Sequence, residues 1–229
     1  MISLRTVWYV SGLMVCLPVY AGRPMATDDA GITEAGACQL ESWAQRNQGF
    51  NEYWAVPACN FTGNLEVAIG RSRAKSDSGH ELASMIQGKT LFKPLRTNGW
   101  GIGLAFGTRF QKGNLNDGDH YAYMPASWSF ADDRLIIHSN IGWLREKANR
   151  RNALTWALGT ESALTAETSV SVEAFGQDIG KPSWQVGARH WIMTDRVQVD
   201  MTYGNRFGQL RGEQRWFSVG LKFVTAPLW

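Results

Sequence analysis

Trp100-Gly-Ile-Gly-Leu-Ala-Phe-Gly107 places large apolar residues at even positions and glycine or alanine at odd positions. A period of two indicates a β-strand, because successive side chains of a strand point to opposite faces of the sheet. Similar alternation, with polar or small residues in the second phase, recurs at 154–158, 197–203 and 217–223. The sequence therefore predicts an all-β protein whose sheet has one apolar face and one polar or small face.

Short polar tetrads at 61–64, 96–99, 131–134, 164–167 and 193–196 contain the Gly, Asn, Asp and Thr that tight turns favour. Longer polar segments, such as Ser72 to Glu81 and Glu146 to Asn152, lie between successive tetrads. Tight turns should therefore alternate with longer loops. The intervening segments give twelve expected strands, near 36–46, 52–60, 64–73, 82–94, 99–110, 120–130, 134–145, 152–163, 167–176, 183–193, 196–204 and 213–225.

Two all-β architectures share this pattern and differ in which face is buried. A soluble sandwich or lipocalin-like barrel turns the apolar face inward, whereas an outer-membrane barrel turns it toward lipid. The even strand count, strands of about ten residues and short turns at one end favour the membrane barrel. Charges in the clearest strands also avoid the apolar phase, where Lys or Arg at the membrane midplane costs about 2–4 kcal/mol. We predict a single antiparallel up-and-down transmembrane β-barrel of about 12 strands.

The N-terminus has the features of an export signal. Arg5 precedes an uncharged, mostly apolar stretch from Thr6 to Ala21, which ends in a cleavage pattern, Val19-Tyr20-Ala21. A transmembrane helix is the alternative, but the stretch is short and contains Pro18. We expect a signal peptide at 1–21, a short periplasmic segment at 22–35 and a barrel at 36–229, in the cell outer membrane of a Gram-negative bacterium.

Export leaves two cysteines, because Cys16 departs with the signal peptide. A hairpin that turns at Gln48-Gly49 would set Cys38 directly opposite Cys59. In an oxidising compartment this arrangement predicts a cross-strand disulfide, the alternative being two reduced thiols. Neither these cysteines nor Thr27-Asp28-Asp29 provides enough ligands for zinc or calcium, so no metal and no cofactor is expected.

Four stretches carry a family resemblance: Arg23-Pro-Met-Ala-Thr-Asp-Asp-Ala30, Gly36-Ala-Cys-Gln-Leu-Glu41, Tyr53-Trp-Ala-Val-Pro-Ala-Cys-Asn60 and Gly63-Asn-Leu-Glu66. They resemble the outer-membrane β-barrel family labelled putative MetA-pathway of phenol degradation. The resemblance implies a transporter-like outer-membrane protein that passes small organic compounds such as aromatics. It implies no catalytic residue.

Charged residues in the polar phase are candidates for lining the barrel lumen. Five are acids and four are bases: Glu41, Glu66, Glu161, Glu173, Asp200, Lys89, Arg109, Arg189 and Lys222. Such a balance permits an open pore whose field orients polar solutes, or ion pairs that close the lumen of a plugged structural barrel. Strand phase stays open in the first, second, fourth and sixth segments, because Trp43, Trp54 and Trp128 interrupt the alternation.

An outer-membrane lipid-modifying enzyme is a third possibility, which would need a nucleophile beside a base. His138 and Ser139 are neighbours in sequence, but consecutive strand residues point to opposite faces. No Gly-x-Ser-x-Gly or His-Glu-x-x-His motif is present, so we expect a channel or facilitator for small solutes, with aromatic or hydrophobic compounds as the candidates, rather than an enzyme.

Charge and the C-terminus define the expected partners. A net charge of +3 without a long basic cluster gives no basis for expecting a nucleic-acid partner. Basic residues assigned to the longer loops are candidates for contacting lipopolysaccharide phosphates: Arg71, Arg73, Lys75, Arg145, Lys147, Arg150, Arg151, Arg206 and Arg211. The final amphipathic segment before Trp229 resembles the signal that barrel-assembly machinery reads. The expected partners are thus outer-membrane lipid, that machinery and a small-molecule solute.

Overall fold

The computed structural model describes residues 23–229 except 77–78, 112–117 and 209–213. The expected signal peptide at 1–21 lies outside these described residues. No helix among the described residues is long and apolar enough to cross a membrane. The described residues form twelve strands: β1 (Cys38–Asn47), β2 (Phe50–Asn60), β3 (Leu65–Ser76), β4 (Gly79–Lys93), β5 (Trp100–Gln111), β6 (Asp119–Phe130), β7 (Leu135–Glu146), β8 (Arg151–Ala163), β9 (Thr168–Gln177), β10 (Ser183–Met193), β11 (Val197–Arg206) and β12 (Trp216–Val224).

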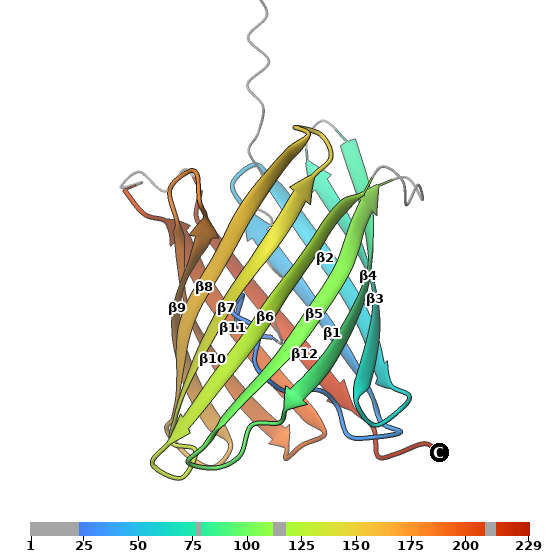
Figure 1. Cartoon of the computed structure of the whole chain (residues 1–229). Coiled ribbons are helices and arrows are strands. Elements are labelled where there is room, and N and C mark those ends of the chain that lie inside the picture. Colours follow the sequence, from blue (N-terminus) through green and yellow to red (C-terminus); the bar gives the residue numbers. More distant parts are fainter. Residues whose placement is uncertain (1–22, 77–78, 112–117, 209–213) are drawn as a thin grey trace, which may run out of the picture.

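The strands form one closed antiparallel barrel, as Figure 1 shows. Each strand pairs with its neighbours in sequence, and β1 closes the ring by pairing with β12, with Glu41 opposite Lys222. Closure gives every strand two partners, which leaves no open sheet edge in the hydrocarbon layer. The predicted twelve-stranded membrane-type barrel is confirmed.

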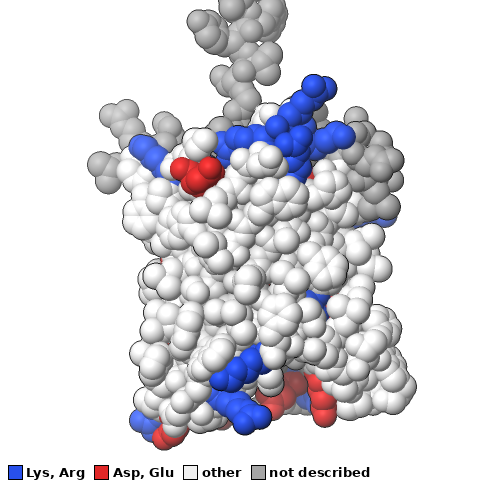
Figure 2. Space-filling view, viewed as in Figure 1, with Lys and Arg blue, Asp and Glu red and all other residues white. Residues whose placement is uncertain are grey.

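The alternation read from the sequence separates an outer apolar face from an inner polar one. Phe106, Leu158 and Val172 are exposed on the outside, whereas Ala105, Ala157 and Ser171, their neighbours in sequence, are buried. Figure 2 shows a largely uncharged band around the visible face, with charged side chains gathered toward both ends. This distribution is the one expected of a barrel whose outer surface contacts lipid.

The two ends of the barrel differ in their connections. The tight-turn end carries the turns at 61–64, 94–99, 131–134, 164–167 and 194–196, together with the C-terminus (Figure 1). Gly99 N donates to Arg96 O at 2.9 Å, and Asn98 takes a left-handed backbone conformation with φ of 53°. The opposite end, named the long-loop end, carries the loops at 147–150 and 178–182. The described connections at this end range from the two-residue turn at 48–49 to the five residues at 178–182, so the predicted alternation of tight turns with longer loops holds only in part.

One predicted loop is instead part of a hairpin. The polar segment Ser72 to Glu81 was expected to connect two strands, but β3 and β4 stay paired up to Ser76 opposite Gly79. Arg71 and Arg73 consequently lie on a strand, exposed on its outer face, rather than in a loop. Backbone pairing does not require apolar side chains, so the polar ends of two adjacent strands continue the ladder.

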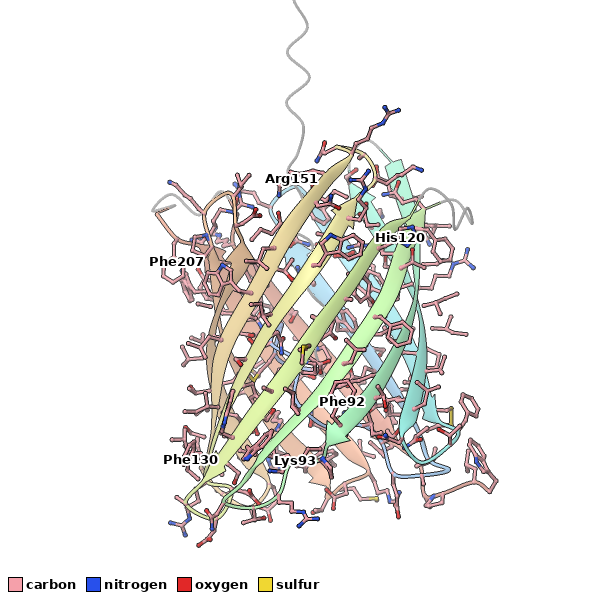
Figure 3. The ribbon with its side chains drawn as sticks, viewed as in Figure 1. Phe92, Lys93, His120, Phe130, Arg151 and Phe207 are labelled. Atoms are coloured by element: carbon pink, nitrogen blue, oxygen red, sulfur yellow. A yellow bond between two sulfur atoms is a disulfide. The ribbon has the colours of Figure 1, made fainter. Side chains whose placement is uncertain are left out.

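Aromatic side chains gather near both ends of the outer surface. Phe92 and Phe130 lie toward the tight-turn end and Phe207 toward the long-loop end (Figure 3), and all three are exposed. At the tight-turn end, Lys93 Nζ lies 3.5 Å from the centroid of the Trp100 ring. Aromatic rings at two levels are typical of the interfacial girdles of membrane barrels.

The predicted disulfide between Cys38 and Cys59 is present, with an S–S distance of 2.05 Å. The two residues are directly opposite in the β1–β2 pair, and their Cα atoms are 4.0 Å apart. Cys38 shares the outward phase of Leu40, whose side chain is exposed. The disulfide therefore joins the first two strands from outside the lumen.

Candidate functional site

The nine charged residues proposed from the sequence as lumen-lining all lie in the inward phase of their strands. Glu41, Glu66, Lys89, Glu161, Glu173 and Asp200 are buried, and Arg109, Arg189 and Lys222 are partly buried. Burial here means enclosure by the barrel, because the exposed outward phase of the same strands is apolar. Their part in solute passage stays a prediction.

Several of these side chains form ion pairs with inward residues of other strands, either the adjacent strand or one farther around the barrel. Lys222 Nζ lies 3.2 Å from Glu41 Oε1, and the Arg189 guanidinium pairs with Glu161. Arg109 pairs at 3.6 Å with Glu52, an acid that the sequence analysis did not single out. Most of the cations predicted for the lumen are therefore neutralised locally, which weakens any long-range positive field.

An inner segment, residues 23–33, runs inside the barrel toward the tight-turn end, where Figure 1 shows it in blue. From the sequence, residues 22–35 were expected to precede the barrel as a short periplasmic segment. The periplasmic location stays a prediction. Hydrogen bonds join the segment to inward side chains of nine strands: β1, β3, β4, β6, β7, β9, β10, β11 and β12. The segment therefore occupies a large part of the lumen.

The inner segment begins with a buried charge pair. The Arg23 guanidinium bonds to the Asp200 carboxylate and donates to Ser218 Oγ at 3.1 Å. Farther along, Glu173 accepts hydrogen bonds from Ala26 N at 2.8 Å and from both Thr27 N and Thr27 Oγ1 at 2.7 Å. Two of the acids predicted to face solute thus hold the chain's own N-terminal residues.

Asp28 occupies the centre of this network. Its Oδ1 accepts from Lys89 Nζ at 2.7 Å, and its Oδ2 accepts from Tyr123 Oη at 2.7 Å. Its backbone is held by Asn140, whose amide accepts from Asp28 N at 2.7 Å and donates to Asp28 O at 2.9 Å. Asp28 therefore bridges strands β4, β6 and β7 through the middle of the barrel.

Aromatic residues whose phase the sequence left open also lie inside. Trp43 and Trp54 stack with centroids 5.6 Å apart, and Trp54 is buried. The guanidinium carbons of Arg23 and Arg109 each lie 5.2 Å from a ring centroid, over Trp43 and Trp54 respectively. Trp128, in contrast, is exposed on the outer face. Trp43 and Trp54 point into the lumen, so large rings stand in the phase that is otherwise polar or small. This is why the alternation of apolar and polar residues fails in β1 and β2.

The inner segment leaves a cavity of about 270 Å³. Its wall includes Asp28, Glu41, Glu66, Lys89, Trp191 and Lys222. The lining extends to Asp195 and Val224 at the tight-turn end of the barrel. The structure therefore leaves space for a small solute beside the inner segment.

A serine and a histidine also meet inside the barrel. Ser127 Oγ lies 2.8 Å from His138 Nδ1, but it also accepts the Ala30 N–H at 2.8 Å. Ser127 is fully buried beneath the inner segment. A nucleophile must reach its substrate, and this hydroxyl instead holds the chain's own backbone. The pair is therefore part of the packing between the segment and the barrel wall.

The fold is shared with several solved structures. The KdgM porin matches with a TM-score of 0.65 at 10% identity, covering 81% of this chain and 98% of that one. The NanC porin matches with a TM-score of 0.61 at 9% identity, covering 81% of this chain and 98% of that one. The COG4313 outer membrane channel from Pseudomonas putida F1 matches with a TM-score of 0.52 at 12% identity, covering 86% of this chain and 97% of that one. The chain therefore has the fold of outer-membrane porins and channels.

Comparison with curated proteins finds no match. The resemblance to the phenol-degradation family stays a prediction, because the family model that matches carries another description. That model extends from the expected signal peptide to the end of β12. The chain belongs to the family described as uncharacterised conserved protein UCP029691, whose model matches residues 10–224.

Proposed function

We propose that the protein is an outer-membrane channel for small solutes, in which the inner segment narrows the path. The observation that carries this proposal is the cavity of about 270 Å³ that remains inside the closed barrel. A barrel that only anchored itself in the membrane would have no need of a solute-sized space lined by charged and aromatic side chains. A KdgM porin solved in complex with disordered oligogalacturonate supports solute entry into a barrel of this fold.

The lumen also supports the finer proposal that the solutes include aromatic compounds. Trp43 and Trp54 stack with each other, and Tyr121 and Tyr123 stack with centroids 6.2 Å apart. These rings line the inner face of a barrel whose remaining inward side chains are mostly polar or small. Trp43 borders the cavity together with Trp191 of β10, and an aromatic solute would lie against these rings between charged groups that orient its polar substituents.

A plugged structural barrel is the alternative, and one observation favours it. The inner segment is hydrogen-bonded to most strands and includes buried ion pairs, so its removal from the lumen has a substantial free-energy cost. In this alternative the segment acts as a permanent strut that stabilises the barrel. The channel and the strut predict different conductances for the protein with and without the segment.

Planar-bilayer conductance separates the channel from the strut. The mature protein and a variant lacking residues 23–30 would be compared, with Asp178→Asn at the long-loop end as the control. For a channel, we expect discrete current steps from the mature protein and larger steps from the truncated variant. Silence from the mature protein with steps from the truncation would support the strut. Silence from both, with folding shown by a heat-dependent gel shift, would contradict any pore.

Lipid contact at the long-loop end is a further part of this proposal. Arg71 and Arg73 are exposed on the outer face of β3, with Tyr53 of β2 opposite Arg73. Figure 2 shows Lys and Arg side chains gathered at this end of the barrel. Guanidinium groups beside a membrane surface suit the phosphates of lipopolysaccharide. Arg211, named from the sequence for the same role, lies outside the described residues.

A further inference from the structure

The lumen cavity contains more negative than positive charge. The cations in its lining are Lys89 and Lys222. Five carboxylates line it as well: Asp28, Asp29, Glu41, Glu66 and Asp195. Lys89 Nζ lies 2.7 Å from Asp28 and 3.1 Å from Asp29, and Lys222 Nζ lies 3.2 Å from Glu41. Neither ammonium group is therefore free to attract an anionic solute, and the cavity keeps an excess of carboxylate charge.

The two acids outside these ion pairs differ in their surroundings. Glu66 Oε2 accepts hydrogen bonds from Thr33 N at 2.9 Å, Thr33 Oγ1 at 2.7 Å and Gln39 Nε2 at 3.3 Å. These donors are neutral, and the cation opposite Glu66 in the β3–β4 ladder, Lys89, already bonds to Asp28 and Asp29. Asp195 lies in the exposed turn between β10 and β11, at the edge of the cavity. Two cations are thus shared among five carboxylates, which leaves an excess of negative charge at the wall and the edge of the cavity.

An aromatic ring completes the cavity near Asp195. Trp191 lies on β10 in the inward phase and lines the same space. The face of an indole ring attracts a cation by electrostatics and offers apolar area at the same time. Trp43, also in the lining, already lies against Arg23 and Trp54. Trp191 is therefore the ring best placed to receive a solute.

We infer that the cavity is a binding site for small organic cations, in which an ammonium group lies among the carboxylates and its apolar part packs against Trp191. The volume of about 270 Å³ is at the lower limit of ligand pockets, which usually span about 300–1,000 Å³. The site therefore fits a compact amine rather than a long oligomer. Negative charge inside a low-dielectric wall also raises the local concentration of cations.

The inference deepens the proposed function, because it names a solute class for the same lumen. Binding and conduction can nevertheless be measured separately. Calorimetry and tryptophan fluorescence on the folded protein in detergent report binding whether or not the barrel conducts. Conductance without amine binding would overturn the cation site alone, whereas amine binding to a silent barrel would contradict the channel alone.

The test compares three probes of similar shape: benzylammonium, benzyl alcohol and benzoate. We expect saturable binding of benzylammonium, at least about tenfold tighter than either other probe, and weakened near 1 M salt, where the Debye length is about 3 Å. Tighter binding of benzoate would overturn the inference, as would equal binding of all three.

Two variants test the residues without disturbing the inner segment. Asp195→Asn removes one charge at a left-handed position that Asn tolerates, with φ of 57°, and Trp191→Leu removes the ring. We expect each to weaken benzylammonium binding roughly two- to fivefold, as suits an exposed ion pair or a cation–π contact. Asp178→Asn is the matched control, since Asp178 is exposed at the long-loop end. Unchanged affinity in both variants, with the barrel folded, would overturn the assignment.

Discussion

Lys89 of β4 and Asp28 of the inner segment form an ion pair of 2.7 Å in the middle of the barrel, and both residues are buried. The pair joins the barrel wall to a segment that precedes the first strand in the sequence. Because a buried charge without its partner is costly, the two residues depend on each other for their position. The pair therefore controls how firmly the inner segment narrows the lumen.

Replacing Lys89 should release the inner segment. In Lys89→Met, the Asp28 carboxylate would stay buried without its cation, at a cost of about 3–5 kcal/mol. We expect amide hydrogens of residues 23–33 to exchange at least about a hundredfold faster by mass spectrometry, while strand amides stay protected. Lys93→Met, on the same strand at the tight-turn end, is the control and should leave exchange unchanged. Equal protection of the segment in both variants would contradict this role.

Removing the disulfide should lower stability without changing the lumen. Cys38 and Cys59 are separated by 21 positions, a loop for which the chain-entropy model gives about 3 kcal/mol. We expect Cys38→Ser/Cys59→Ser to lose free energy of unfolding of that order in urea titrations in detergent. Conductance should stay at the unmodified level, because the disulfide lies in the outward phase. A changed conductance would show that the disulfide also shapes the lumen.

Small residues in the inward phase of β5 should be sensitive to added volume. A Cβ at Gly103 would lie 2.6 Å from the backbone oxygen of Thr90 on β4, which cannot move freely. We expect Gly103→Ala to lower the free energy of unfolding by about 1–3 kcal/mol. Gly176→Ala, whose nearest contact would be 3.2 Å, is the control with a smaller effect. Urea titrations in detergent measure both losses, and equal losses would refute steric crowding on β5.

Acid should weaken the turn between β6 and β7. Hydrogen bonds from Ser129 and Thr97 lower the pKa of Asp133 below its usual 3.8. A lowered pKa in the folded state stabilises the protein above the unfolded pKa, and that contribution is lost as the pH falls through the folded pKa. We expect Asp133→Asn to destabilise the barrel at about pH 7 but much less near pH 2. Urea titrations at both pH values check this, with Asp178→Asn as the control. An equal loss of stability at both pH values would contradict a role for the Asp133 carboxylate.

The fold was largely predictable because membrane barrels depend on local periodicity. Trp100 to Gly107 identifies a strand with one apolar face, and repeated turn tetrads define the hairpins. Each hairpin register then follows from its turn, which is why Cys38 and Cys59 could be paired from sequence. The missed strand ends at 74–76 and 79–81 lack large apolar side chains, so periodicity carries no signal there.

The candidate site was only partly predictable. The phase of Glu66, Asp200 and Lys222 follows from alternation, so their inward direction could be expected. The partners of Asp200 and Glu66 could not be predicted, because Arg23 and Thr33 belong to a segment without periodicity. An imbalance between acids and bases in the strands could have suggested that the remaining counter-charges come from elsewhere in the chain.

By itself, the sequence determined the all-β class, the alternation of apolar and polar faces, the hairpin register and the disulfide, because each depends on residues close along the chain or on a two-residue period. Only the tertiary structure decided that residues 23–33 lie inside the barrel, that Trp43 and Trp54 face the lumen, and that a cavity lined by carboxylates remains. These features join Arg23 to Asp200 and Asp28 to Lys89 across long stretches of chain. Such contacts exist only after twelve strands have closed into a ring, since closure brings the inward side chains of distant strands around one enclosed space.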